Sequence, residues 1–181
     1  MERYNLLVTF HPQDAGLAER EVRKRIEEAG GQVEDVERSS INGVFCVQVA
    51  DDAKGIVRTM REEFADAPHM LAHTFHWVPV DRWVEASDEA MLEAVRDAAQ
   101  GIGDSQRWMM HVHKRHHPAS SEELMLTLTD PIVKGKVDLK HPEKIIAVEV
   151  LGAMAGISLL ERDEIIDVNR MRQEIGLTKL A

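Results

Sequence analysis

The sequence predicts an α/β (α+β) fold built from two domains. Short runs in which apolar and polar residues alternate, typical of strands, interleave with stretches whose apolar residues recur at helical spacing. The 181 residues can form one large or two small domains with a buried core, and hydrophobic residues make up 44% of them, as in globular proteins. A short connection at residues 79–87 marks the expected boundary, which gives domains 1–80 and 81–181.

Residues 1–80 show the order strand, helix, strand, strand, helix, strand. The Asn42-Gly43 dipeptide predicts a hairpin between the second and third strands, because a tight turn needs positive φ. The expected elements are strand 5–10, a helix with Ala18, Val22, Ile26 and Ala29 on one face, strands 33–37 and 44–49, a helix capped by Asp51 or Asp52, and strand 71–77. This β-α-β-β-α-β order predicts a ferredoxin-like domain.

Residues 81–181 are expected to mix helices and strands in a second α/β domain. Ser120 and Glu123 have capping-box spacing, and Asp130-Pro131 has the form of a further helix start. The expected elements are a helix capped by Ser87 or Asp88, strand 107–115, a helix from Ser120, a helix start at Asp130-Pro131, strands 137–139, 145–151 and 157–160, and a final helix with Ile165, Val168, Met171 and Ile175 on one face.

The segment from Val137 to Leu160 contains the longest apolar stretch and organises this domain. His141-Pro142 ends its first strand, because proline lacks an N–H and restricts the residue before it. Ile145 to Leu151 reads as a strand buried on both faces, with Glu149 as its one ionisable residue. Gly152 and Gly156 are expected to bracket the reversal into the next strand.

The composition bears on which ligands the protein can bind and on the cellular compartment that we expect for it. The net charge of −10 argues against indiscriminate binding to nucleic acid or membranes through overall charge, although it leaves room for a local basic patch. The single cysteine, Cys46, has no internal disulfide partner, and we expect it to be a buried thiol. With no signal-like apolar segment at the start and no run long enough to span a bilayer, we expect a soluble cytoplasmic protein.

Motifs for catalysis are missing from the sequence. It contains no G-x-S-x-G elbow, no P-loop and no G-x-G-x-x-G dinucleotide fingerprint, so we predict neither catalytic residues nor a cofactor. Glu149 is the one candidate for a carboxylate with a raised pKa. We interpret it instead as a buried structural acid paired with Lys114 or Arg115, and keep a small enzyme that uses Glu149 or His111/His113 as an alternative.

Histidines cluster in one strand and the turn after it, at His111, His113, His116 and His117. His111 and His113 share one strand face, a spacing that some metal sites use. The sequence places no cysteine or carboxylate beside them, so we predict no metal site and interpret the rings as polar groups at a strand edge.

Basic residues gather at strand ends and turns around the apolar segment. They are Lys114, Arg115, Lys134, Lys136, Lys140 and Lys144, with His116, His117 and His141. If their strands are neighbours, these side chains are expected to converge on one rim of the sheet and to neutralise several phosphates. Lysines also decorate ordinary exposed turns, and composition does not separate the two interpretations.

The second half resembles the THUMP domain of RNA-modification proteins. The residues that carry the resemblance are RWMMHVHKR (107–115), SSEELMLTL (120–128) and KVDLKHPEKIIAVEVLGAMAGISLL (136–160). The ferredoxin-like first half is similar to the domain that precedes a THUMP domain. The resemblance therefore covers nearly the whole chain, through patterns of core residues and without catalytic signatures.

The resemblance implies a tRNA-binding function. In that family the domain pair binds structured RNA, typically the acceptor end of tRNA, and positions it for a modifying enzyme. It implies an adaptor that presents tRNA to a separate acetyltransferase forming N4-acetylcytidine, or alternatively the RNA-binding subunit of a methylation or thiolation complex. A further alternative is a module that docks an acidic protein and no RNA. The implied RNA-binding residues are Lys114, Arg115, Lys136, Lys140, His141 and Lys144.

Overall fold

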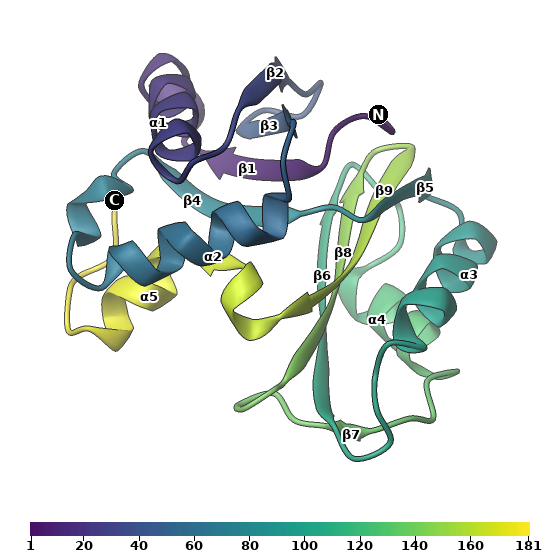
Figure 1. Ribbon diagram of the computed structural model, residues 1–181. Helices are drawn as coiled ribbons and strands as arrows, with labels where there is room; N and C mark the ends of the chain where they lie inside the picture. Colours follow the sequence, from purple (N-terminus) through teal and green to yellow (C-terminus); the bar gives the residue numbers. More distant parts are fainter. The chain divides into compact units, whose positions relative to one another are not determined.

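The computed structural model describes residues 1–181 and has the predicted α+β fold, with two five-stranded sheets (Figure 1). Contacts divide the chain into two compact units. The N-terminal unit comprises Arg3–Pro79 and Asp163–Ala181, and the central unit comprises Val80–Arg162 with Met1–Glu2.

The N-terminal unit has the predicted β-α-β-β-α-β order. Its strands are β1 (Leu6–Phe10), β2 (Val33–Arg38), β3 (Val44–Val49), β4 (Thr74–Pro79) and β10 (Ile166–Asp167), and its helices are α1 (Ala15–Glu28), α2 (Ala53–Phe64) and α5 (Val168–Glu174). Short 3-10 turns span Pro12–Asp14 and Pro68–Met70. The strands form an antiparallel sheet in the order β10-β4-β1-β3-β2, which is the ferredoxin-like arrangement with β10 added at one edge.

Local signals in this unit behave as the sequence predicted. Gly43 has φ +82° in the turn between β2 and β3, and a Cβ there would lie 2.7 Å from the Phe10 carbonyl oxygen. Only glycine combines that backbone angle with that close approach. Of the two candidate caps for α2, Asp52 is the one that accepts a hydrogen bond from the Lys54 N–H.

The last 19 residues, Asp163–Ala181, pack with the N-terminal unit. Strand β10 pairs with β4, with Ile166 opposite Trp77, and the Arg61 guanidinium donates to the Ile165 carbonyl at 2.9 Å. Ile166, Val168 and Met171 join the same core as β1 and α2. This division differs from the expected 81–181 domain because helical spacing shows that a segment has an apolar face but not which core receives that face.

The central unit contains the second sheet, in the order β5-β9-β8-β6-β7. Its elements are β5 (Arg82–Glu85), α3 (Asp88–Ala99), β6 (Arg107–Arg115), α4 (Ser121–Thr129), β7 (Lys136–Val137), β8 (Lys144–Leu151) and β9 (Met154–Glu161). A 3-10 turn at Arg162–Glu164 begins with the last residue of this unit. Strand β6 runs parallel to both β7 and β8, whereas the β8–β9 and β9–β5 pairs are antiparallel.

Capping and burial in the central unit follow the sequence closely. Ser120 and Glu123 form the predicted capping box at α4, and Ser87 caps α3. From Ile145 to Leu151, strand β8 is buried throughout, Glu149 included. Trp108, Met110 and Val112 of β6 share a core with residues of α3 and α4. No helix of the chain combines the length and apolar character that a membrane span requires.

Three local expectations for this unit are wrong. The connection at 79–87 contains a strand, β5, that completes the edge of the sheet. No helix begins at Asp130-Pro131, where the chain turns after α4. Gly156 lies inside β9, and the reversal is made by Gly152 at φ +59°. A Cβ at Gly156 would lie 3.0 Å from a Val80 methyl group, so close packing explains this glycine.

The strand expected at 137–139 is shorter than predicted. Strand β7 covers only Lys136–Val137 at the edge of the sheet. Val137 and Leu139 are 65% and 67% exposed, so their alternation with polar residues does not mark a buried face.

Replacing Ile166 by alanine tests the placement of the C-terminal segment. Ile166 is fully buried in the N-terminal core, so we expect a loss of about 2–5 kcal/mol in the free energy of unfolding. Hydrogen exchange followed by mass spectrometry should show faster exchange in β1 and β4 and unchanged exchange in β8. Ile175→Ala, at a position 44% exposed, is the control and should change little. Faster exchange confined to β8 and β9 would contradict the division into units.

Candidate functional site

The register of β6 against its neighbours determines where the predicted RNA-binding residues lie. Arg107 pairs with Lys136 of β7, and Trp108 pairs with Lys144 of β8. At the far end of the same strand, Arg115 pairs with Leu151. Because the strands are parallel, Lys136 and Lys144 lie beside the first residues of β6, whereas Lys114 and Arg115 are its last.

The predicted convergence of all the basic residues on one rim is therefore wrong. Arg107 and Lys114 are separated by about 23 Å of extended strand. Had β8 run antiparallel to β6, Lys144 would lie beside Arg115, and the sequence alone does not decide between the two directions. The structure brings Lys136, Lys140, His141 and Lys144 to one end of the sheet and leaves Lys114 and Arg115 at the other.

Arg107, which pairs with Lys136, and Lys134, whose carbonyl accepts the Trp108 indole N–H, lie at the same end as the first group, and we call the whole set the basic end. It consists of Arg107, Lys134, Lys136, Lys140, His141 and Lys144. The turn that carries Lys140 and His141 is fixed by the Asp138 carboxylate, which accepts their backbone N–H groups at 2.9 and 3.0 Å. These two bonds, that of His141 first, lower the pKa of Asp138 below its ordinary value. Pro142 in the same turn is buried. The turn is thus a defined structure, with Lys140 and His141 exposed on it.

Not all charges at the basic end are equally available. The Glu143 carboxylate accepts the backbone N–H of Arg107 at 2.9 Å and its Nε at 3.4 Å, and the Lys144 Nζ lies 3.2 Å from Glu161. Lys134, Lys136 and Lys140 are exposed and take part in no ion pair. These three ammonium groups are free to bind an anionic ligand.

The structure adds cations that sequence reasoning did not assign to the site. The sequence marks Arg107 only as the first residue of a strand, and its place beside Lys136 follows from the register. Arg96, on the last turn of α3, lines a hollow with Ala99, Gln100 and residues 131–134. Helical spacing puts Arg96 on the exposed face of α3, but no local pattern brings it next to Lys134.

Lys114 and Arg115, the other two predicted RNA-binding residues, make hydrogen bonds to groups of the protein itself. The Lys114 Nζ donates to the His117 carbonyl at 3.2 Å. The Arg115 guanidinium donates to the Glu149 carboxylate at 2.8 Å, and its side chain is only 22% exposed. Glu149 is therefore paired with Arg115, one of the two partners that the sequence suggested.

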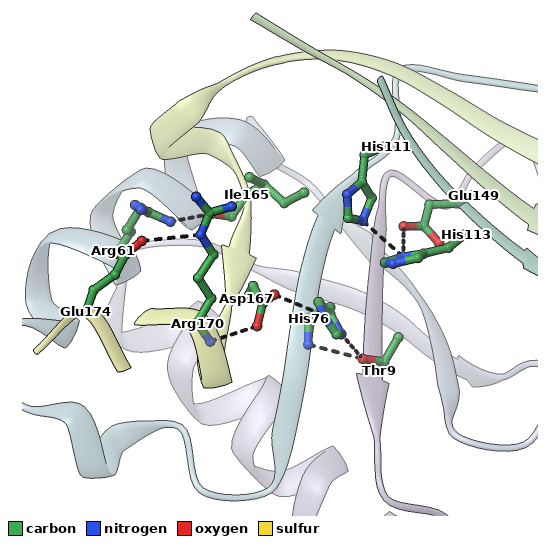
Figure 2. Close-up of polar contacts among 10 residues, drawn as sticks. All are labelled: Thr9, Arg61, His76, His111, His113, Glu149, Ile165, Asp167, Arg170 and Glu174. Atoms are coloured by element: carbon green, nitrogen blue, oxygen red, sulfur yellow. Dashed lines mark hydrogen bonds and ion pairs between the residues drawn. The ribbon is translucent and has the colours of Figure 1, made fainter. Parts of the chain in front are cut away.

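Glu149 is the centre of a cluster on one face of β6 and β8 (Figure 2). Its Oε1 lies 3.0 Å from His113 Nδ1, and that nitrogen lies 3.3 Å from His111 Nε2. Burial alone would raise the pKa of the Glu149 carboxyl, but hydrogen bonds and charge from His113 and Arg115 lower it below the ordinary value. The expectation that no carboxylate accompanies these histidines is wrong, because the strand register places Glu149 opposite His113.

A second polar chain links β1, β4 and β10 in the N-terminal unit (Figure 2). Thr9 Oγ1 lies 3.0 Å from His76 Nδ1, and His76 Nε2 lies 3.5 Å from Asp167. Burial acts to raise the pKa of Asp167, but bonds from His76 and the Arg170 N–H lower it to about 2. The Thr9 hydroxyl also accepts the His76 backbone N–H at 3.1 Å, so we interpret this chain as a link between strands and not as an activated nucleophile.

No protein-family model matches this sequence, and no curated protein matches it. The fold is similar to that of solved proteins. PH1313 from Pyrococcus horikoshii aligns with TM-score 0.53 and 17% identity over 87% of this chain and 55% of its own length. TrmN from Thermus thermophilus aligns with TM-score 0.57 and 20% identity over 91% of this chain and 47% of its own.

A third solved protein gives the same result. SMU.472, a candidate methyltransferase in complex with SAH, aligns with TM-score 0.53 and 13% identity over 89% of this chain and 42% of its own length. This chain thus spans about half the length of the proteins that it matches. At these identities the likeness shows a common fold that covers most of the chain.

Replacing Arg115 by methionine tests the ionic cluster. The change leaves the buried Glu149 carboxylate without its guanidinium, so we expect a loss of about 3–5 kcal/mol at neutral pH. Because His113 and Arg115 hold the folded-state pKa of the Glu149 carboxyl below its ordinary value, the wild-type advantage is full above the ordinary value and declines as pH falls through the folded-state pKa. Urea unfolding from pH 7 to pH 3 measures both effects.

The control for this prediction is Arg23→Met. It removes an exposed ion pair between neighbouring turns of α1 and should cost less than about 1 kcal/mol. A difference between Arg115→Met and wild type that stays constant down to pH 3 would show that Glu149 is not the group responsible.

Proposed function

We propose that this chain binds the acceptor end of tRNA through the basic end and presents the RNA to a separate modifying enzyme. The observation that carries this proposal is the set of unpaired cations Lys134, Lys136 and Lys140 around the defined turn at Asp138. The resemblance of residues 107–160 to THUMP domains supports RNA as the ligand.

The charge distribution suits weak binding of RNA phosphates at one place on the surface. Each ammonium group that meets a phosphate releases a condensed counterion, which favours binding at low salt. The net charge of −10 leaves the remaining surface acidic and therefore repels nucleic acid elsewhere. Recognition would then depend on backbone shape and on a few contacts at one place, as is usual for structured RNA.

A division of labour with a separate enzyme follows from the same features. The basic end has cations and a hollow beside Arg96, and the resemblance to THUMP domains rests on core residues and not on catalytic signatures. In this proposal the chain binds and orients the tRNA, and the partner enzyme catalyses the modification. The acetyltransferase that forms N4-acetylcytidine is the partner we propose, with a methylation or thiolation enzyme as the alternative.

The double variant Lys136→Ala/Lys140→Ala tests the RNA surface. We expect weaker binding to tRNA, and a plot of log affinity against log salt whose slope falls by about 1.4–1.8, because two phosphate contacts are lost. Fluorescence anisotropy of labelled tRNA over a range of salt concentrations measures both quantities. Lys24→Ala/Lys179→Ala changes the net charge equally at exposed positions of the N-terminal unit and is the matched control.

Two outcomes would contradict this assignment. Equal weakening by the two double variants would show that only overall charge matters. Unchanged affinity and slope in Lys136→Ala/Lys140→Ala would exclude the basic end, and a loss in Lys114→Ala would then place the RNA at the opposite end of β6. Absence of tRNA binding by the wild type would favour docking of an acidic protein instead.

Reconstitution tests the proposed partner. A purified tRNA cytidine acetyltransferase, acetyl donor and tRNA are combined with and without this chain, and N4-acetylcytidine is quantified by nucleoside mass spectrometry. We expect product formation to rise with the concentration of this chain, and to rise less with Lys136→Ala/Lys140→Ala. Tight tRNA binding without any gain in N4-acetylcytidine would contradict the acetyltransferase and favour the methylation or thiolation alternative.

A further inference from the structure

Three metal-ligating side chains converge within the central unit. His111 and His113 come from one face of β6, and Glu149 comes from β8 directly opposite His113. The potential donor atoms of all three lie within 4.8 Å of one another. The two imidazole rings meet edge to face, with centroids 4.0 Å apart and planes at 77°. The proposed RNA-binding function does not use this cluster.

Protons alone satisfy this arrangement poorly. His113 Nδ1 lies 3.0 Å from a Glu149 oxygen and 3.3 Å from His111 Nε2, yet it can hold only one hydrogen. When each ring carries its hydrogen on the other nitrogen, His113 Nδ1, His111 Nε2 and Glu149 Oε1 all direct lone pairs into the space between them. A divalent cation at that position would accept all three lone pairs at once.

We propose that His111 Nε2, His113 Nδ1 and Glu149 Oε1 form a binding site for zinc or a similar late first-row divalent ion. Ligand atoms about 2.0–2.1 Å from a tetrahedral zinc ion lie about 3.3–3.4 Å apart. Two of the observed separations, 3.0 and 3.3 Å, are close to this spacing, and the third lies within 4.8 Å. Two imidazoles with one carboxylate favour such ions over magnesium and calcium, which prefer oxygen ligands.

Arg115 acts as a positioning residue for this site. Its Nη1 holds the Glu149 Oε2 at 2.8 Å and so directs Oε1 toward the two histidines. The Glu149 side chain is only 3% exposed, so its orientation is fixed by these contacts inside the protein. Contacts of this kind to the outer oxygen of a ligand are common around protein metal sites. The bound ion would join β6 to β8.

Metal titration of the full-length chain tests the site. The protein is purified without a polyhistidine tag, stripped with EDTA and titrated with Zn²⁺ by calorimetry and with Co²⁺ by visible absorption. We expect saturable binding of one ion per chain, with a Co²⁺ spectrum typical of tetrahedral coordination. His111→Ala should weaken binding by more than about tenfold. This variant keeps the His113–Glu149–Arg115 contacts, so its fold should be retained, and circular dichroism checks that it is.

Exposed histidines of the same unit provide the matched controls. His116→Ala and His141→Ala should bind Zn²⁺ as the wild type does. Equal affinity of His111→Ala and wild type would overturn the proposal, as would binding that fails to saturate or that depends on His116 or His141. Because tRNA binding is measured separately, failure of the metal site leaves the proposed RNA function standing, and the reverse also holds.

Discussion

The parallel pairing of β6 with β8 is the constraint on which the features of the central unit depend. Its register sets Trp108 opposite Lys144 and His113 opposite Glu149. The first pair gathers the turn lysines at the start of β6. The second pair puts a buried carboxylate against two histidines and within reach of Arg115. A shift of one residue would move Glu149 to the other face, among the apolar side chains that pack against α3 and α4.

This constraint separates two regions with different chemistry along one strand. The basic end has exposed ammonium groups on a turn fixed by Asp138, and suits a large anionic ligand that binds from solvent. The cluster around Glu149 is half-buried and charge-balanced, and suits a small ion or an internal structural role. One strand thus supports the proposed RNA-binding surface and the proposed metal site without sharing residues between them.

Much of the fold follows from short-range patterns, and most of what the sequence missed depends on long-range pairing. The capping box at Ser120 and Glu123, the turn at Asn42-Gly43 and the buried strand around Glu149 are fixed by neighbours in the chain, so the sequence predicts them. The direction of β8 relative to β6 is not a local property. The sequence therefore does not show that Lys114 and Arg115 lie at the opposite end of the sheet from Lys144. Long-range pairing also places Ile166 in the N-terminal core and His113 against Glu149. Local patterns in the sequence predict neither contact.

Lysine footprinting in the presence of tRNA tests the central claim most directly. The protein is acetylated briefly with a reagent that modifies accessible amines, with and without tRNA, and each modified lysine is quantified by mass spectrometry. The account predicts that tRNA protects Lys134, Lys136 and Lys140 and leaves Lys24 and Lys179 unchanged. Protection of Lys114 without protection of Lys136 and Lys140 would contradict it, and so would the absence of any protection at saturating tRNA.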